Sequence, residues 1–322
     1  MAHEFEVIAR YFTPPMPNGV VGGGDDCAYF SVSPQHQLAT SADLLLEGRH
    51  FFPDVDPYLL GRKSLAVNLS DLAAAGARPL GCLLSLGLPT VNQEWLAAFS
   101  RGFLELAAEH GCPLIGGDTT RSQADLTIGV TVFGEVPNGQ APLRSRAQAQ
   151  DDIWLTGELG AADVALRYLS GEWPLDGARL AATRSTLENP NPPVQFAQYA
   201  RPYMHAAIDV SDGLAQDLTH ILTASNCGAQ LWYEALPIHA ALLGLDASSQ
   251  QAAVLAGGDV FQLCFTAPAT HRDTLQKLAQ NHGILLSRIG CITASSGLQI
   301  LDAQKQPIAL TRLGFNHFSA ST

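Results

Sequence analysis

Polar residues interrupt the apolar stretches of this chain at spacings that predict individual helices and strands. Residues 64–77, SLAVNLSDLAAAGA, predict one helix in which Ser64, Asn68 and Asp71 share a narrow polar stripe. The other positions are apolar nearly all round, so this helix should be buried, and Gly76 predicts its carboxyl end. Asp71 then stands in the last turn, where its charge opposes the helix dipole. It needs either hydrogen bonds from a neighbouring loop or a bound cation.

The same pattern predicts further elements on either side of this helix. Apolar or alternating runs predict strands at residues 37–46, 80–89, 126–136, 152–156 and 206–209, with shorter ones after Asp26, before Gly116 and after Asp259. Helical spacing predicts helices at residues 92–110 and 161–171 and after Asp212. Strands interleaved with helices indicate an α/β (α+β) protein. The Pro-, Gly- and Gln-rich stretch between the halves predicts an amino-terminal domain, 1–137, and a carboxy-terminal domain, 150–322.

Composition and charge narrow the class of protein. The chain has 322 residues, which favours two domains, and its 47% hydrophobic and 15% charged residues indicate a well-buried globular protein. The 30 acidic residues outnumber the 18 basic ones and give a formal charge of −12, which argues against a nucleic-acid-binding surface. A polyphosphate ligand would need cations in order to approach such a chain.

Neither a membrane span nor a signal peptide is expected. The sequence contains no run of about 18 apolar residues, and its amino terminus carries Glu4, Glu6 and Arg10 in an amphipathic pattern. A cytoplasmic location is therefore expected. The six cysteines are scattered without a CxxC motif, so they predict neither a disulfide framework nor a zinc site.

Several aspartates stand where water should have poor access. Besides Asp71, five occupy predicted strands, strand ends or a helix start: Asp26, Asp43, Asp118, Asp209 and Asp212. Some have plain structural alternatives, since Asp26 can belong to an aspartate-rich turn, Asp212 can cap a helix, and Gly-Gly-Asp at 116–118 is a common turn. His50, close in sequence to Asp43, is either an ordinary hydrogen-bonded histidine or a ligand.

Taken together, the aspartates point to a divalent cation. Six like charges in poorly solvated places would raise one another's pKa unless cations neutralised them. Oxygen ligands without a Cys/His cluster select magnesium or manganese rather than zinc. The residues therefore indicate magnesium-dependent nucleotide chemistry. Neither a Walker loop nor the protein-kinase HRD and DFG signatures are present, so those two architectures are excluded.

An ordered set of motifs resembles the thiamine-monophosphate kinase family, within the aminoimidazole ribonucleotide synthetase and selenophosphate synthetase superfamily. The motifs are GDDCA, SADLLLEGRHF, KSLAVNLSDLAAAGARP, IGGDTT, IDVSDGL and GFNHF. The resemblance runs from about residue 5 to the last few residues, and it implies ATP-dependent conversion of thiamine monophosphate to thiamine diphosphate by direct in-line transfer. It also implies a homodimer in which the amino-terminal mixed sheet and helices form a dimer-interface barrel, with an active site completed by an α/β carboxy-terminal domain.

The resemblance also implies a role for individual residues. The implied magnesium ligands, with Ala42 acting through its carbonyl, are Asp26, Ser41, Ala42, Asp43, Asp71, Asp118, Asp209 and Asp212. The implied ATP contacts are Gly117, Asp118, Arg144 and Ser211. The implied contacts to thiamine monophosphate are His50, Asp259, Arg312 and Phe315. No catalytic base is expected, because the acceptor phosphate is already an anion at neutral pH.

The chain departs from the family pattern at several positions. It has Ala42-Asp43 where Thr-Asp is usual, and GGDVFQL where GGEDYEL is usual, so Asp259 is one methylene shorter than Glu. Asn316 replaces an aspartate, and Arg312 stands where an aromatic residue often helps to hold the thiamine ring. Phe315 is the obvious substitute for that aromatic residue.

Three other functions remain compatible with the residues alone. One is a second superfamily activity, the ATP-dependent ring closure of a ribonucleotide amide, which would release phosphate without phosphorylating thiamine. Another is a metal-dependent phosphatase, which would need no ATP. A calcium-binding protein without enzymatic activity is disfavoured, because no EF-hand loop is present.

Overall fold

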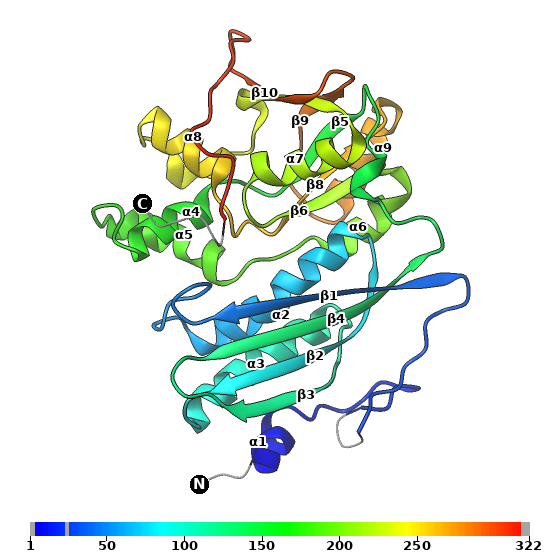
Figure 1. The fold of residues 1–322 in the computed structure, drawn as a ribbon, viewed down its shortest axis with the longest axis vertical. Coiled ribbons are helices and arrows are strands. Elements are labelled where there is room, and N and C mark those ends of the chain that lie inside the picture. Colours follow the sequence, from blue (N-terminus) through cyan, green and yellow to red (C-terminus); the bar gives the residue numbers. More distant parts are fainter. Residues whose placement is uncertain (1–3, 23–25, 317–322) are drawn as a thin grey trace. The chain divides into compact units, whose positions relative to one another are not determined.

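The chain folds into two compact units (Figure 1). The computed structural model describes residues 4–22 and 26–316, without the side chains of Glu4 and Phe5. Unit 1 comprises Met1–Leu72 and Ala77–Gly139, and unit 2 comprises Ala73–Gly76 and Gln140–Thr322. Each unit contains its own sheet, as expected for a mixed α/β chain.

Unit 1 is built on a four-stranded mixed sheet. Its strands are β1 (His36–Leu46), β2 (Arg78–Leu88), β3 (Leu114–Arg121) and β4 (Thr127–Pro137). Their spatial order is β1-β4-β2-β3; β2 and β3 run parallel, and the other neighbours run antiparallel. The expected strands at residues 37–46, 80–89 and 126–136 are confirmed to within two residues.

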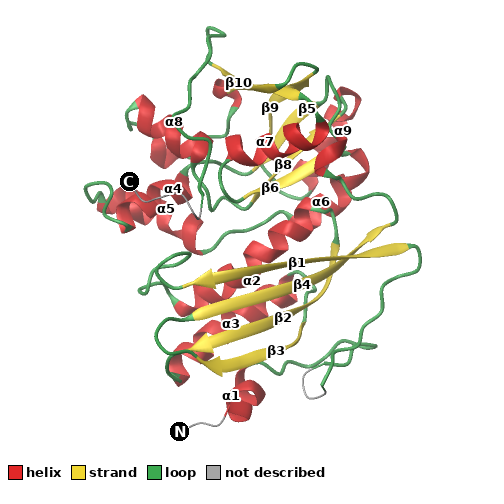
Figure 2. Ribbon diagram, viewed as in Figure 1, coloured by secondary structure: helices red, strands yellow, loops and turns green. Residues whose placement is uncertain are grey.

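The helices of unit 1 are α1 (Glu4–Tyr11), α2 (Pro57–Ala74) and α3 (Gln93–Glu109). Helices α2 and α3 cover one face of the sheet (Figure 2). Helix α2 contains the apolar segment predicted from residue 64, but it begins at Pro57, because the apolar spacing continues through Leu59 and Leu60. Helix α3 begins as expected, because the side chain of Asn92 accepts hydrogen bonds from the amides of Glu94 and Trp95.

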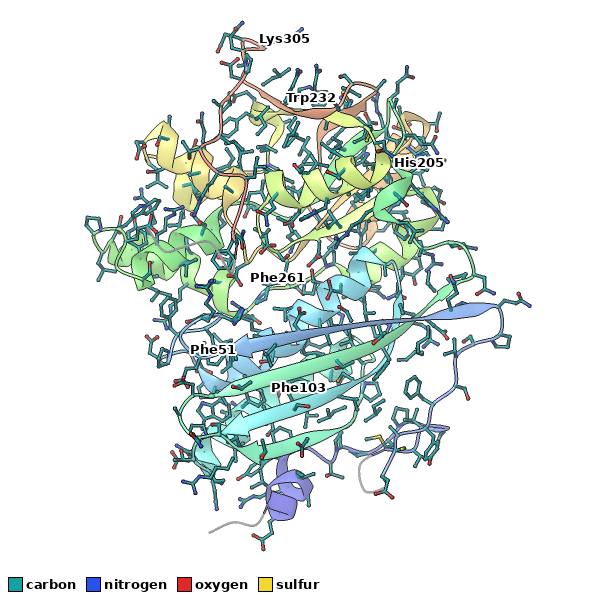
Figure 3. All side chains as sticks on the ribbon, in the orientation of Figure 1. Phe51, Phe103, His205, Trp232, Phe261 and Lys305 are labelled. Atoms are coloured by element: carbon teal, nitrogen blue, oxygen red, sulfur yellow. The ribbon has the colours of Figure 1, made fainter. Side chains whose placement is uncertain are left out.

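Helices α2 and α3 meet at two glycines. A Cβ atom on Gly61 of α2 would lie 2.1 Å from the carbonyl oxygen of Phe99, and one on Gly102 of α3 would lie 2.0 Å from that of Tyr58. No side chain fits at either position, so the two backbones touch directly. Phe103, the next residue along α3, is fully buried and is labelled in Figure 3. This contact fixes α2 against its neighbour.

The second face of the unit 1 sheet differs in character. Side chains alternate along a strand, so the odd-numbered residues Ser41 and Asp43 of β1 face α2 and the even-numbered ones point away. Leu38, Leu44 and Leu46 belong to the latter set and are 49%, 56% and 38% exposed. These leucines form an exposed apolar stripe along β1.

Unit 2 contains a six-stranded sheet. Its strands are β5 (Asp152–Thr156), β6 (Ala206–Val210), β7 (Gly228–Trp232), β8 (Gln262–Ala267), β9 (Leu286–Thr293) and β10 (Gly297–Leu301). Their order is β10-β7-β9-β5-β8-β6, with β10 and β7 parallel and the other pairs antiparallel. The expected strands at 152–156 and 206–209 are confirmed.

Six α-helices accompany this sheet in the described part of unit 2. They are α4 (Ala161–Leu169), α5 (Gly177–Glu188), α6 (Val194–Ala200), α7 (Leu214–Ser225), α8 (Ala247–Ala256) and α9 (Arg272–Asn281). Apolar residues of β5, β6 and α7 share one buried core, which includes Ile153, Ile208 and Leu218. Packing against this core holds the start of α7 beside the end of β6.

Two local expectations are wrong. Residues Gly116–Thr120 do not follow a strand but lie inside β3, because they pair in parallel with Leu83–Gly87 of β2. Between Asp26 and the start of β1 at His36 the described residues form no strand, and Tyr29 makes only an isolated bridge with Val21. Gly23, Gly24 and Asp25 lie outside the described residues.

Among the helices of the described ranges, none combines the length and the apolar character that crossing a bilayer requires.

Candidate active site

Strand β1 and helix α2 bring three predicted ligands together. The hydroxyl of Ser41 donates a 2.6 Å hydrogen bond to Oδ2 of Asp71. Asp43 lies two residues further along the same face of β1, and burial together with the nearby charge of Asp71 raises the pKa of Asp43 to about 6. Two carboxylates and a hydroxyl therefore occupy one partly buried location, which we call the β1–α2 cluster.

The polar stripe of α2 explains how this cluster is held. Asn68 accepts a 3.1 Å hydrogen bond at Oδ1 from the backbone amide of Asp43, and its Nδ2 donates to the carbonyl of Ser64 at 3.3 Å. Ser64 itself turns inward and donates to the carbonyl of Leu60 at 2.7 Å. Asn68 and Asp71 thus contact β1 as side chains, whereas Ser64 braces the helix.

His50 lies in the turn that follows β1. Its Nδ1 accepts a 3.0 Å hydrogen bond from the amide of Leu46, so a neutral His50 carries its proton on Nε2. Beneath the turn, the almost fully buried Lys63 donates from Nζ to the carbonyl of His50 at 3.2 Å. The turn therefore presents His50 in a defined tautomer that suits an anionic partner.

Asp118 lies apart from the β1–α2 cluster within unit 1. It pairs with Ser85 of β2, Ser85 pairs with Gly129 of β4, and Gly129 pairs with Leu44 of β1. Paired residues lie on the same face of a sheet, so Asp118 shares the face of Leu44 and points away from Asp43. Its neighbour Gly117 has φ +151°, and a Cβ atom there would lie 1.8 Å from the carbonyl oxygen of Leu84. Only glycine fits at that position.

In unit 2, the end of β6 and the turn before α7 carry three of the predicted site residues. Asp209 is the fourth residue of β6 and is buried, while Ser211 and Asp212 follow in the turn and are partly exposed. Asp212 does not cap α7, contrary to one of the sequence-based alternatives. The N-cap is Gly213, with φ +135°, and the carboxylate of Asp212 instead accepts a 3.1 Å hydrogen bond from Nε2 of Gln216.

A carboxylate that the sequence did not single out holds this turn. Oδ2 of Asp217 accepts the amides of Ser211, Asp212 and Gly213 at 3.1, 3.1 and 3.0 Å. Burial raises the pKa of Asp217 to about 7, while these amide donors act to lower it. The sequence contained one signal for this role. Asp217 follows Gly213 by four residues, and Gly213 stands at the start of a predicted helix.

Two further segments reach the same turn. The amide of Asp259 donates to the carbonyl of Ser211 at 2.8 Å, and that of Phe261, labelled in Figure 3, donates to the carbonyl of Val210 at 2.8 Å. Both donors have positive φ, +56° and +51°. From the carboxy-terminal segment, the amide of Phe315 donates to the carbonyl of Asp212 at 3.0 Å. Unit 2 therefore gathers Ser211, Asp212, Asp259 and Phe315 around one turn.

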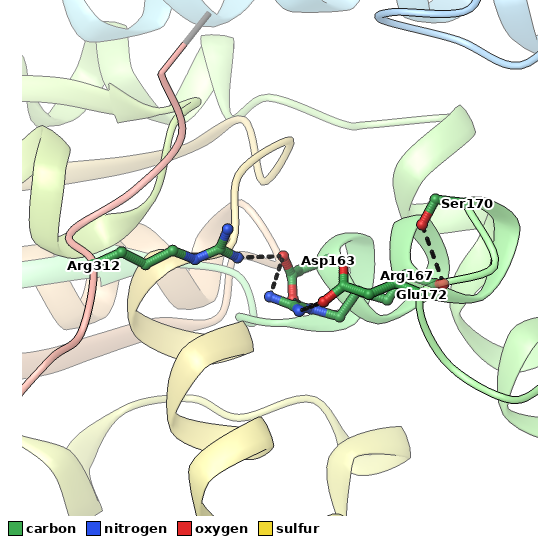
Figure 4. A network of polar contacts seen from close by, with 5 residues as sticks. All are labelled: Asp163, Arg167, Ser170, Glu172 and Arg312. Carbon is green, nitrogen blue, oxygen red and sulfur yellow. Dashed lines mark hydrogen bonds and ion pairs between the residues drawn. The ribbon is translucent and has the colours of Figure 1, made fainter. Parts of the chain in front are cut away.

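Arg312 is engaged by a structural ion pair. Its Nη2 lies 3.6 Å from Oδ1 of Asp163 on α4, a carboxylate that Arg167 also holds through a 2.5 Å hydrogen bond (Figure 4). Glu172 pairs with Arg167 and extends this network. Burial raises the pKa of Asp163 in spite of both arginines. Asp163 thus connects the carboxy-terminal segment to α4.

Arg144 lies in a short 3-10 helix, Arg144–Arg146, before β5. Its carbonyl accepts a 2.7 Å hydrogen bond from Ser225, which is the last residue of α7. This contact fixes the backbone of Arg144, and the residue itself is exposed.

The poor solvation expected for the aspartates holds only in part. Asp43, Asp71, Asp209 and Asp212 are buried or half-buried, but Asp26 and Asp118 are exposed, because one lies in a bend and the other on an open sheet face. Within residues 4–22 and 26–316, no group of three or more His, Cys, Asp or Glu side chains is arranged to hold a metal ion. The β1–α2 cluster contributes two such side chains, Asp43 and Asp71, beside the hydroxyl of Ser41.

The fold and these acidic segments define the class of protein. Residues 24–136 match the sequence profile described as AIR synthase related protein, N-terminal domain. The whole chain is 38% identical over 322 residues to thiamine-monophosphate kinase of Escherichia coli (strain K12), with 98% of each sequence covered. The chain therefore belongs to the thiamine-monophosphate kinase family.

Solved structures agree with this assignment. The crystal structure of thiamine-monophosphate kinase from Stenotrophomonas maltophilia K279a superimposes with a TM-score of 0.82 at 42% identity, covering 88% of this chain and 91% of that one. The structure of AaThiL complexed with AMPPCP and TMP gives a TM-score of 0.77 at 24% identity, covering 89% of each chain. At that lower identity the second comparison supports the fold alone.

Proposed function

We propose that this chain transfers the γ-phosphate of ATP to thiamine monophosphate, giving thiamine diphosphate and ADP. As a member of its family the chain is a kinase, and 38% identity over nearly the full length supports the same substrates. AaThiL, which has the same fold, is complexed with AMPPCP and TMP. The observation that carries the proposal is the β1–α2 cluster, which places two carboxylates and a hydroxyl beside one another.

The donor groups of this cluster fit a magnesium ion. All its side-chain donors are oxygen atoms, which magnesium prefers. Burial and the charge of Asp71 raise the pKa of Asp43, and a bound cation would offset both effects. We assign Ser41, Asp43, Asp71 and the carbonyl of Ala42 as ligands from β1 and α2. The remaining proposed magnesium ligands are Asp26, Asp118, Asp209 and Asp212.

Transfer is proposed to be direct and in line. An oxygen of the acceptor phosphate attacks the γ-phosphorus, a new P–O bond forms, and the bond to the bridging oxygen of ADP breaks. Bound magnesium would supply charge neutralisation between the donor and acceptor phosphates. The protein needs no strong base, because the acceptor oxygen already carries negative charge. Catalysis then consists of positioning and electrostatic stabilisation.

Other residues are proposed to hold the two substrates. Gly117, Asp118, Arg144 and Ser211 are assigned to ATP, and Gly117 allows close approach because it has no side chain. His50 is assigned to the phosphate of thiamine monophosphate, to which its Nε2–H would donate. Asp259 and Phe315 flank one turn of unit 2, and we assign them to the same substrate. Arg312 remains assigned there as well, although its ion pair with Asp163 supports a bracing role.

We further propose a cytoplasmic homodimer. The exposed leucines of β1 support a second copy packing on that sheet face, in the manner of a barrel. In this arrangement residues 1–137 bind metal and ATP and form the dimer, while residues 150–322 complete the set of ligands. The same face carries Asp118, so a second copy could also receive that carboxylate. Two features support a cytoplasmic location: the use of ATP as co-substrate, and the six cysteines, all of which are free.

A direct assay tests the proposed function. The purified full-length chain is incubated with ATP, magnesium and thiamine monophosphate, and thiamine diphosphate is measured by chromatography. Product is expected with magnesium and none with excess EDTA. ADP and phosphate without thiamine diphosphate would overturn the proposal, and the same products formed with a ribonucleotide amide in place of thiamine monophosphate would favour ring-closure chemistry. Phosphate release from the substrate without ATP would indicate a phosphatase.

A further inference from the structure

The turn that carries Ser211 and Asp212 is held by an unusual acceptor. A single oxygen, Oδ2 of Asp217, accepts the amides of residues 211, 212 and 213 at 3.1, 3.1 and 3.0 Å. Asp217 is only 3% exposed, and it belongs to the first turn of α7. A charged group at that depth is costly, and three donors converging on one oxygen offset part of this cost.

This arrangement changes what the start of α7 can do. Backbone amides that converge in a turn, like those of residues 211–213 before α7, commonly form a binding site for phosphate. Here the chain's own carboxylate already occupies the three converging amides. A nucleotide therefore cannot use these donors while Asp217 remains in place. What the turn still presents are the side chains of Ser211 and Asp212, which are partly exposed.

The rest of the turn depends on the same backbone. The carbonyl of Ser211 accepts the amide of Asp259 at 2.8 Å, and that of Asp212 accepts the amide of Phe315 at 3.0 Å. Gly258 is packed closely there as well, because a Cβ atom on it would lie 2.5 Å from the carbonyl oxygen of Ser211. A change in the peptide orientation of residues 211–213 would move all these contacts together.

We propose that Asp217 is a positioning residue, whose carboxylate fixes the backbone of residues 211–213 so that Ser211 and Asp212 are presented to the magnesium–nucleotide complex. It does not touch substrate, since it is buried beneath the turn. This inference rests on the proposed function, because it is that function which assigns Ser211 and Asp212 to nucleotide and metal.

Three substitutions at Asp217 separate positioning from general stability. Asp217→Asn keeps an acceptor oxygen at the same place, Asp217→Ala removes it, and Asp217→Glu keeps the charge but displaces the oxygen. Asp151→Ala is the matched control. Asp151 also lies in unit 2 and is also 3% exposed, but its partners are Gln148 and His205, which do not belong to the turn. For each protein we would measure magnesium-dependent binding of a non-hydrolysable ATP analogue by calorimetry, the melting temperature, and the KM for each substrate.

We expect Asp217→Ala and Asp217→Glu to weaken analogue binding and to raise the KM for ATP about tenfold or more, as a small misplacement of ligands does. Asp217→Asn should stay within about threefold of the wild type, because its oxygen can accept the same amides. Asp151→Ala should lower the melting temperature without weakening analogue binding.

The inference would be overturned if Asp217→Ala bound the ATP analogue as tightly as the wild type does. It would also be overturned if Asp151→Ala lost as much affinity for the analogue as Asp217→Ala. If Asp217→Ala does not fold, unchanged binding in Asp217→Glu overturns it instead. Failure of the proposed function is distinguishable. A wild-type chain that binds the analogue but forms no thiamine diphosphate refutes the proposed reaction, while the variants still test positioning. A wild-type chain that binds no nucleotide refutes both.

Discussion

The hydroxyl of Ser41 and the carboxylate of Asp71 are joined by a 2.6 Å hydrogen bond across β1 and α2. This bond connects a strand residue to the last turn of a helix that is apolar over most of its surface. It places Asp71 near Asp43, whose pKa is raised first by burial and further by the charge of Asp71. A buried helix therefore delivers its one carboxylate to a second carboxylate, which is an unfavourable arrangement for the protein without a cation.

Replacing Asp71 should separate function from stability. Asp71→Asn keeps an oxygen that can accept the Ser41 hydroxyl but removes a like charge from beside Asp43. We expect turnover to fall by about 100-fold or more, as when a group that stabilises transition-state charge is lost. The melting temperature should stay the same or rise. Asp125→Asn, at an exposed loop position of unit 1, is the control and should leave both unchanged. Marked unfolding of Asp71→Asn would instead indicate a structural role.

The raised pKa of Asp43 predicts a pH dependence of stability. Its folded pKa is about 6 against a reference of 3.8, so the folded protein binds the proton more tightly than the unfolded chain does. The metal-free protein should therefore lose stability as pH rises from about 4 to about 6. Asp43→Asn removes this penalty and should be more stable at neutral pH by on the order of 1–3 kcal/mol.

Chemical denaturation at several pH values in EDTA checks this prediction. The difference between Asp43→Asn and the wild type should shrink as pH falls and vanish about one pH unit below the reference pKa of 3.8, where the carboxyl group is protonated in both states. A constant difference at all pH values would mean that Asp43 acts through packing instead. Added magnesium should stabilise the wild type, because a ligand that binds only the folded state raises its stability.

His50 is predicted to discriminate between the substrates. Its Nδ1 accepts the amide of Leu46, so the neutral ring carries its proton on Nε2, the nitrogen that we assign to the acceptor phosphate. His50→Ala should raise the KM for thiamine monophosphate by about tenfold, the loss of one charge-assisted hydrogen bond, with a smaller effect on ATP. Steady-state kinetics with each substrate varied in turn measures this difference. An equal change in both KM values would move His50 out of the acceptor site.

The position of Asp118 predicts complementation between subunits. Asp118 lies on the exposed sheet face on which we propose that a second copy packs, whereas Asp43 and Asp71 lie on the α2 side. In such a dimer, Asp118 of one copy would complete the site that contains Asp71 of the other. Asp71→Asn and Asp118→Asn proteins should each be inactive alone. When they are refolded together, about half of the mixed dimers' sites would contain both wild-type carboxylates. Activity that stays absent after mixing, with heterodimers confirmed by mass spectrometry, would place Asp118 in its own subunit's site.

The spacing of apolar residues, every second residue in strands and about every 3.6 residues in helices, predicted most of the strands and helices of unit 1. The alternation in residues 37–46 led to β1, and Asn92 before an apolar helical pattern led to the start of α3. The aspartate in a strand and the aspartate on an apolar helix were both unusual locally, and the structure places them together. An aspartate at a position where its local structure disfavours a charge was therefore a useful predictor of the β1–α2 cluster.

The face of Asp118 could not be predicted in the same way. It depends on the register of β3 against β2 and of β2 against β4, and no local pattern specifies which residues pair across strands. Asp217 was missed for a related reason. Its role arises from where three amides of a turn point, and an aspartate in the first turn of a helix is otherwise unremarkable.

The direct backbone contact of α2 with α3, made by Gly61 against Phe99 and by Gly102 against Tyr58, has a consequence for mutational surveys of this chain. Gly61 stands ten residues before Asp71 on α2, about 15 Å along the helix axis at 1.5 Å per residue. A single methyl group at either glycine would force α2 and α3 apart. Because α2 is a continuous helix, this displacement would extend to its carboxyl end, where Asp71 lies. Substitutions at these two sites would then inactivate the protein without touching any ligand, and an alanine scan read alone would assign them to the active site by mistake.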